Sequence, residues 1–309
     1  MRRMSLTMQW LWVVLFVLTT VSPVMARGSK SLKKRIAVFV FQDKTDKRFR
    51  WWDGRSVGDG VADMLTTALV KSGKYIVLER QEMDKLLQEQ DLGTSGIVTP
   101  ESAAKIGKML GVELAVMGAV TEFGYSKSEV GGAIKGIGLG VKSQAATVAV
   151  DVRLVNTSTG EIVAAENVRK SKSKKGLRIR TDEWRFNSRN DFDQSLVGKA
   201  ARDAINSVVK LIDKHAPKIR WQAKVVLAKS GMVVINAGAS AGVKKGQRFV
   251  VFHPGEELID PDTGLSLGSM ETEVGMIEVV NNQMGNGKAS QCKIISGDGF
   301  ARGDLVREK

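Results

Sequence analysis

The sequence predicts an α/β domain followed by a small all-β domain. Short apolar runs alternate with helical patterns up to about residue 120, and long strands of alternating character follow from about residue 131. Beyond a proline break at Pro217 only short strands and turn signals remain. We therefore expect a three-layer-type α/β domain with a mixed sheet and long β-hairpins over residues 27–216, and a β-barrel or sandwich over residues 217–309.

The composition is that of a folded, basic protein. The chain has 309 residues, of which 43% are apolar and 26% charged, close to globular averages. This excludes a disordered or fibrous protein, and the length favours about two domains. The net charge is +14.

The first 26 residues have the pattern of a secretory signal peptide. Arg2 and Arg3 precede an apolar run over residues 10–18, and Ala26 ends a small-residue cleavage motif. The alternative is an uncleaved signal anchor, but the run is shorter than the roughly 20 residues that a spanning helix needs. We predict cleavage after Ala26 and export to the periplasm, in association with the outer membrane.

Export affects how Cys292 and the charge are interpreted. Cys292 is the single cysteine, so it forms no disulfide within the chain, and it lies far from the predicted cleavage site. We therefore expect a protein that is not a lipoprotein. An exported protein rarely meets nucleic acid, so anionic envelope surfaces are the expected partners of its positive charge.

The elements of the first domain follow from periodicity and capping residues. Ser72-Gly73 ends one helical pattern, and Thr99-Pro100 opens another as an N-cap followed by proline. The predicted elements are a strand at 36–41, a helix at 57–69, a strand at 75–78, a short helix around 83–87, a helix from 99 to about 111 and a strand at 114–120.

A glycine-rich hairpin and a basic tract come next. Ile137, Leu139 and Val141 alternate with glycines, and the returning strand alternates up to Leu154. After a turn at residues 156–162 the basic tract runs from Arg169 to Arg180. Lys170, Lys172, Lys174, Arg178 and Arg180 fall on one face of an extended strand, with Lys175 on the other. A long amphipathic helix over residues 196–212 closes the domain.

The second domain is predicted as short strands separated by turn signals such as Lys245-Gly246. The expected strands are residues 224–227, 232–235, 248–252, 274–280 and 289–295. Asp260, Asp262 and Glu271 have the spacing of a calcium loop, but Gly264 and Leu265 stand where an oxygen ligand and a glycine belong. We interpret this segment as a turn between strands.

No constellation for catalysis is found in the sequence. His215 and His253 have no cysteine or acidic partner at ligand spacing, and no phosphate loop, nucleophile elbow or zinc-protease helix occurs. We expect no enzyme, no metal and no cofactor.

Several segments between about Arg35 and Ile212 resemble the curli production assembly/transport family, usually called the CsgG family. They are residues 62–75 followed by Val77-Leu78-Glu79-Arg80-Gln81, the glycine-rich stretch after Phe123-Gly124-Tyr125, residues 152–162 and Leu196-Val197-Gly198-Lys199-Ala200. The remainder resembles the C-terminal domain of the flagellar assembly protein FlgT, on residues 234–238, 242–247 and 259–264.

The first resemblance implies a homo-oligomeric ring whose subunits each give two β-hairpins to an outer-membrane barrel for a secreted protein subunit. It also implies that the loop before the first helix lines a constriction. The matching residues are Phe49, Arg50, Trp51, Trp52 and Arg55. Aromatic and arginine side chains there could contact a passing chain. Alternatively, Trp51 and Trp52 only pack under the helix.

The sequence departs from the exporter pattern in two respects. The lipobox cysteine of curli exporters is absent, and the second hairpin has an apolar band only about two residues deep per strand, whereas spanning strands need about 9 to 11 residues. Two functions remain open. One is a ring-forming component of envelope secretion or surface-appendage assembly. The other is a soluble or peripheral periplasmic scaffold whose basic tract binds anionic surfaces; the tract could also be only a solvated face.

Overall fold

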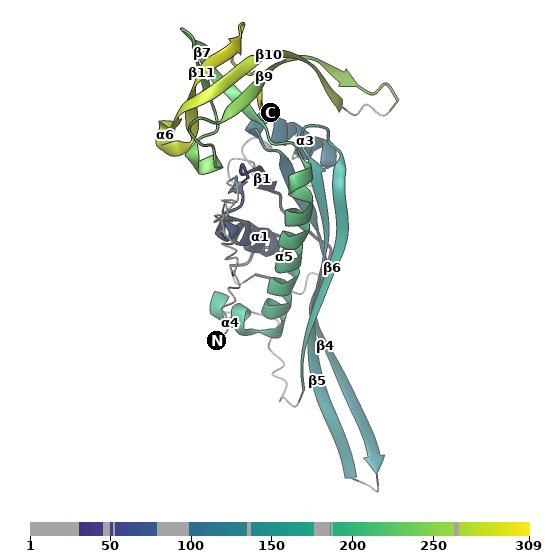
Figure 1. Cartoon of the computed structure of the whole chain (residues 1–309). Coiled ribbons are helices and arrows are strands. Elements are labelled where there is room, and N and C mark those ends of the chain that lie inside the picture. Colours follow the sequence, from purple (N-terminus) through teal and green to yellow (C-terminus); the bar gives the residue numbers. More distant parts are fainter. Residues whose placement is uncertain are drawn as a thin grey trace, which may run out of the picture. The chain divides into compact units, whose positions relative to one another are not determined.

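The computed structural model describes residues 31–45, 50–51, 53–78, 99–134, 137–175, 186, 188–262 and 266–309 (Figure 1). Within these ranges an α/β part with a mixed sheet is followed by a closed six-stranded antiparallel barrel. The predicted fold class is confirmed. The predicted signal peptide and the predicted short helix around residues 83–87 lie outside the described residues.

The sheet of the α/β part has parallel and antiparallel strands, in the order β3-β1-β4-β5-β6, with β2 paired to β4. Strand β1 runs parallel to β3 and β4, whereas β4, β5 and β6 are antiparallel neighbours. The strands are β1 (Arg35–Val38), β2 (Gln42–Asp43), β3 (Ile76–Val77), β4 (Leu114–Ile134), β5 (Ile137–Asn156) and β6 (Ile162–Lys175).

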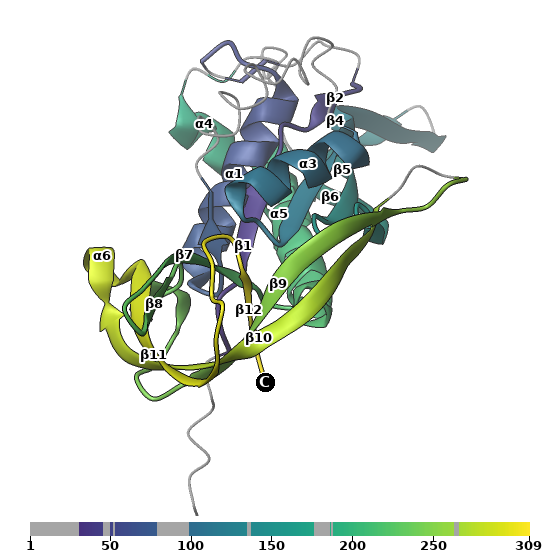
Figure 2. The ribbon, with the colours of Figure 1, turned by 90° about the horizontal axis from the view of Figure 1, so that it is seen from above.

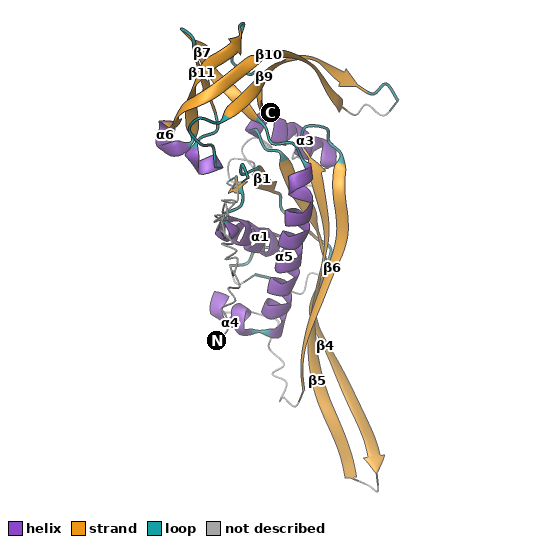
Figure 3. Cartoon of the chain, viewed as in Figure 1, coloured by secondary structure: helices purple, strands orange, loops and turns teal. Residues whose placement is uncertain are grey.

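Helices cover both faces of this sheet (Figure 3). Helices α1 (Val57–Ser72) and α5 (Leu196–His215) share a core with Ile36 of β1, while α3 (Pro100–Leu110) shares one with Ala37. Successive strand side chains point to opposite faces, so a continuous apolar run supplies both layers. This explains why the run at residues 36–41 lacks alternation.

Capping residues define where α1 and α3 begin and end; the sequence predicted those at Gly73, Thr99 and Gly111 but not the cap at Ser56. Ser56 and Asp59 form a capping box at the start of α1, and Thr99 caps α3. Gly73 and Gly111 end the two helices with left-handed φ values of 65° each. A side chain at either position would be strained, which makes glycine the suitable residue.

Strands β4 and β5 form a hairpin that extends beyond the helices (Figure 1). Pairing runs from Leu114 opposite Asn156 to Ile134 opposite Ile137, and strands of about 20 residues are about 65 Å long. The sequence predicted only residues 114–120 for the first strand. Glycines in the distal part weaken the strand signal there, because glycine is depleted in strands.

The second part of the chain is the barrel, in which six strands close in the order β10-β11-β8-β7-β12-β9 (Figure 2). Trp221 stacks on Phe249 in its core at 5.4 Å between ring centroids. Burial there raises the pKa of the Cys292 thiol to about 12. The strands are β7 (Ala223–Lys229), β8 (Met232–Ile235), β9 (Arg248–Ile259), β10 (Ser266–Gln283), β11 (Ala289–Gly297) and β12 (Leu305–Glu308).

Short helical segments complete the described elements. They are α4 (Arg189–Gln194), the 3-10 turns η1 (Ala216–Lys218) and η2 (Ala239–Ala241), and α6 (Met284–Gly287). None of the helices in the described ranges is both long and apolar enough to cross a membrane.

A buried carboxylate links the sheet to the barrel. Glu113, only 5% exposed, accepts hydrogen bonds from the backbone N–H of Arg35 at 2.7 Å and of Gln222 at 3.3 Å. Burial raises the pKa of Glu113 to about 7, although these hydrogen bonds and the nearby Arg35 guanidinium act in the opposite direction. The charge of this link therefore changes near neutral pH.

We predict that Leu65→Ala lowers the free energy of unfolding by about 2 to 5 kcal/mol, because Leu65 is fully buried between α1 and the sheet. Val70→Ala on the same helix is the matched control, since Val70 is 59% exposed. It should change stability by less than about 0.5 kcal/mol. Urea unfolding measures both, and equal losses would contradict the assigned core face of α1.

We predict that ionisation of Glu113 lowers the free energy of unfolding as pH rises. The folded state holds this proton more tightly than the unfolded chain, where the pKa is 4.5, so stability is lost between about pH 4.5 and 7. Between pH 5 and pH 8 the wild type should lose about 2 kcal/mol relative to Glu113→Gln, which has no charge to desolvate. Urea unfolding of both proteins at both pH values tests this. A constant difference would show that Glu113 titrates normally.

Candidate functional site

A groove of about 610 Å³ lies beside the loop that precedes α1. It is bounded by this loop, by α1, and by residues of α4 and α5. Its lining is apolar at Trp51, Met64, Phe192 and Ile205, and charged at Asp53, Arg55, Asp63, Lys71, Arg189, Asp193 and Arg202. The groove therefore brings together two regions that are far apart in the sequence, residues 51–71 and residues 189–206.

The loop is closed by its own backbone. The N–H of Trp51 donates to the carbonyl of Arg55 at 3.0 Å, and the N–H of Gly54 donates to the carbonyl of Trp51 at 2.9 Å. Gly54 has a φ of 84°, which a residue with a side chain rarely adopts. Ser56 follows directly as the N-cap of α1. The loop is thus a compact turn anchored on the helix.

Trp51 lies in the core at the base of the groove. It is 3% exposed, and its ring covers Gly60 of α1 so closely that a Cβ there would be 2.3 Å from the ring. Its ring centroid is 4.7 Å from that of Phe192 and 6.3 Å from that of Phe123. Trp51 therefore packs under helix α1, which is the alternative to a position that lines a constriction. Arg50, by contrast, is exposed, and Phe49 and Trp52 lie outside the described residues.

A β-bulge in β4 brings Phe123 into this aromatic cluster. Val120 pairs with Val150 and Glu122 with Ala149, so Thr121 is an extra residue in β4. Because of it, Phe123 takes the face that Val120 occupies, and both belong to the core under α1 and α5. Glu122 is turned to the opposite face, where it pairs with Arg169 at 2.9 Å.

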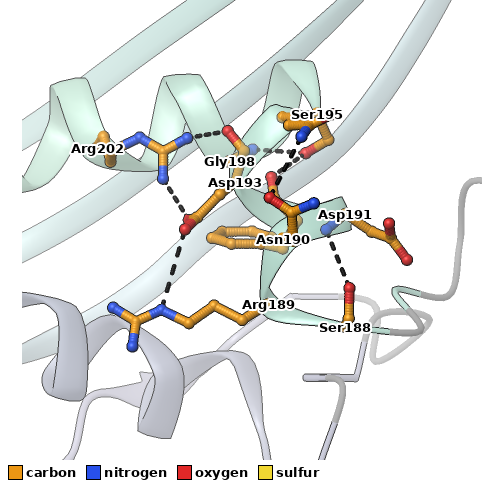
Figure 4. Close-up of polar contacts among 10 residues, drawn as sticks. Ser188, Arg189, Asn190, Asp191, Asp193, Ser195, Gly198 and Arg202 are labelled. Atoms are coloured by element: carbon orange, nitrogen blue, oxygen red, sulfur yellow. Dashed lines mark hydrogen bonds and ion pairs between the residues drawn. The ribbon is translucent and has the colours of Figure 1, made fainter.

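The short helix α4 supplies the other wall of the groove, and Figure 4 shows the polar contacts around it. Ser188 accepts a hydrogen bond from the N–H of Asp191 at 3.2 Å, and Ser195 accepts one from Gly198 at 2.9 Å, so both helices start with a serine cap. A Cβ at Gly198 would be 1.9 Å from the carbonyl oxygen of Phe192. Glycine at this position therefore allows the close approach of α5 to α4 that places Phe192 under the groove.

Charged groups of both signs form the rim of the groove. Arg55 lies between Asp53 and Asp63, at 2.8 and 2.7 Å. Its pKa is raised by hydrogen bonds to Asp53 and Asp63. Slight burial raises the pKa of Asp53, but hydrogen bonds from Arg55 outweigh this and hold it below the usual value. These ion pairs orient the charges on the rim.

The second ion-pair cluster of the rim centres on Asp193. Arg202 of α5 donates to both the carboxylate and the carbonyl of Asp193, and Arg189 lies 3.9 Å from the same carboxylate (Figure 4).

The groove as a whole has an aromatic floor and a rim with charges of both signs, which suits a polypeptide segment. Within the described ranges no group of His, Cys, Asp and Glu side chains could hold a metal ion.

The sequence pointed to Trp51 and Arg55 but missed Arg189, Phe192, Asp193 and Arg202. Helix α4 is only six residues long, too short for a periodic pattern. The available signal was its cap, Ser188 followed three residues later by the acidic Asp191.

The basic tract lies elsewhere, on β6. Lys172 forms an ion pair of 2.6 Å with Asp203 of α5, so this face of the strand is turned towards that helix. Lys170 is opposite Val148 and is half-buried, and Lys174 is opposite Gln144 and exposed. Lys175 ends the described part of β6, but its side chain, Arg178 and Arg180 lie outside the described residues.

Comparison with known proteins identifies one family. The family model "Curli production assembly/transport component CsgG" matches residues 18–230. The curated proteins of that name from Salmonella typhimurium and from Escherichia coli (strain K12) are each 30% identical over 146 residues. Each match covers 44% of this chain and 52% of the relative, so the chain spans about half the length of the curated relatives it matches.

Solved structures give weaker likenesses. A hypothetical protein from Chlamydia trachomatis has a TM-score of 0.37 and 16% identity, and the match covers 59% of this chain and 97% of that one. The PelC dodecamer from Paraburkholderia phytofirmans has a TM-score of 0.30 and 13% identity, with 57% and 86% covered.

We predict that Trp51→Ala lowers the free energy of unfolding by about 3 to 5 kcal/mol, because it empties the centre of the aromatic cluster. Arg50→Ala, at the exposed neighbouring residue, is the control and should cost less than about 0.5 kcal/mol. Chemical unfolding of the purified variants measures both. If Trp51→Ala left stability unchanged but altered export, Trp51 would be a pore residue instead.

Proposed function

This chain belongs to the CsgG family, and from that premise we propose that it is a ring-forming component of cell-envelope secretion or surface-appendage assembly. The family consists of non-enzymatic secretion components, which agrees with the expectation that the chain is not an enzyme. The proposed working form is a homo-oligomer at the outer membrane that conducts a secreted protein subunit.

The observation that carries this proposal is the β4–β5 hairpin. Its pairing is continuous to Ile134 opposite Ile137, and its distal part runs past the helices (Figure 1). Ile137, Leu139 and Val141 alternate with small residues there. A long two-stranded ribbon is marginally stable alone in water, whereas several copies side by side would satisfy its open edges. This is the arrangement that a ring of subunits would provide.

The groove beside α1 could serve the same function as a contact for a polypeptide. In the proposed ring, the loop from Arg50 to Arg55 would lie at the constriction, with the groove behind it. Trp51 would then act as a support of the loop, since it is buried under Gly60. Arg50 and Arg55 would be the residues that present charge to the passing chain.

A peripheral periplasmic scaffold is the second candidate, and the contacts of β6 favour it. The ion pair between Lys172 and Asp203 holds the basic face of β6 against α5. A face covered by a helix does not meet lipid, so β6 would not supply a second spanning hairpin over this stretch. In this alternative the barrel part, with its proposed likeness to FlgT, would be a docking module, and Lys174 would contribute to an anionic-surface contact.

Fractionation of the mature protein separates the two candidates. If the hairpin is integral to the outer membrane, the protein should stay with that membrane after high-salt and carbonate washes and be extracted by detergent as a large ring. Release by salt alone would overturn the channel in favour of the scaffold.

A hairpin variant sharpens this test. Val141→Arg should reduce carbonate-resistant retention at least several-fold, because Val141 is opposite Val130, four pairs from the end of the hairpin, and an arginine facing lipid at the bilayer midplane costs about 2 to 4 kcal/mol. Val70→Arg, on the exposed face of α1, adds the same charge as a control and should leave retention unchanged. Equal retention of both variants would contradict insertion of the hairpin.

A further inference from the structure

The β9–β10 hairpin extends from the barrel as an arm (Figure 1). We call residues 254–262 and 266–273 the acidic arm. Strand β12 pairs with β9 only from Phe249 to Phe252, and β11 pairs with β10 only from Gly275 onward. The acidic arm is therefore a two-stranded ribbon with two open edges, and Figure 2 shows it reaching beyond the other barrel strands.

The charge of this segment is opposite to that of the whole chain. No lysine or arginine occurs between Arg248 and Lys288, in a protein with a net charge of +14. The same segment has seven acidic residues: Glu256, Glu257, Asp260, Asp262, Glu271, Glu273 and Glu278. Without them the net charge would rise from +14 to +21.

Part of this acidic charge is used within the molecule. Glu257 pairs with Lys108 of α3, and Glu271 pairs with Arg307 of β12. The contact of Glu257, which is opposite Ser269, ties the middle of the acidic arm to α3, and the contact of Glu271 ties its base to β12. Glu256, Asp262 and Glu273 are exposed and form no ion pair with any other described residue. Their charges are available to a partner.

Apolar side chains accompany these acids. Leu258, Ile259, Leu267 and Met270 are between 44% and 63% exposed. They make up four of the ten large apolar residues that are exposed in the described part of the chain. Apolar residues concentrated on a projecting, open-edged ribbon are typical of an interaction surface.

We propose that the acidic arm docks on a basic surface of a second copy of this chain. The partner must be basic, and the chain outside the arm segment is strongly so. Two acidic arms would repel each other, so the contact joins the arm of one copy to a different surface of the next. Such head-to-tail contacts close into rings when the rotation permits. The inference rests on the proposed ring and names its subunit contact.

Oligomer size tests this docking on the full mature protein extracted in mild detergent. One arm variant combines Leu258→Ser with Leu267→Ser, and a second combines Glu256→Lys with Glu273→Lys. The matched control combines Val226→Ser with Leu227→Ser on β7, where the two residues are 42% and 45% exposed. Sedimentation should show at least tenfold weaker assembly for both arm variants. The control should assemble like the wild type, and all variants should keep the melting temperature of the wild type.

The outcomes separate this inference from the proposed function. A monomeric wild type would overturn the ring and the docking together. A ring that persists in both arm variants would overturn the docking alone. Arm variants that keep the ring but lose envelope retention would assign the acidic arm to another partner, and this would also overturn docking on a second copy.

Cross-linking gives a direct measurement. Met270→Cys places a thiol on the acidic arm, whereas the native Cys292 is buried in the barrel core and its pKa is raised by burial. A linker that joins this thiol to lysines should connect two differently tagged copies in a mixed preparation. Cross-links confined to lysines of the same copy would contradict the docking.

Discussion

A single β-bulge in strand β4 determines which residues reach the candidate site. Before it, Leu114, Val116 and Val120 face α1 and α5, and after the extra residue Thr121 that face is taken by Phe123. Strand β5 has no compensating change over residues 146–154, so the bulge alone changes which face the residues of β4 occupy. Without it Phe123 would leave the cluster around Trp51, and Glu122 would be driven into the core without Arg169.

The aromatic cluster in turn links the loop to both helices. The ring of Trp51 covers Gly60 of α1, and the backbone carbonyl of Phe192 approaches Gly198 of α5, so both contacts depend on a helix position without a side chain. Such close packing leaves little room to shift, which holds the loop of Arg50 and Arg55 in one position. The position of the groove therefore depends on packing in the core, whereas its charges are held in place by the ion pairs of the rim.

The sequence predicted the features that local chemistry decides. Gly73, Thr99 and Gly111 act on neighbouring backbone groups, so the end of α1 and both ends of α3 could be predicted. Other features could not be predicted, because they depend on partner strands far along the chain. They are the full length of β9 and β10, the strand β12 and the bulge at Thr121. For the same reason it could not be predicted that Lys172 pairs with Asp203, or that Glu113 accepts the N–H of Gln222.

The distribution of charge along the chain allows assembly and surface binding at once. Charges further apart than about 8 Å are largely screened at physiological ionic strength, so the acidic arm and the basic residues act on partners separately. Head-to-tail association would place the acids of one copy against the bases of the next, while each copy keeps its net positive charge. An assembled ring would therefore remain attracted to an anionic envelope surface, and its subunits would not need a neutral chain to associate.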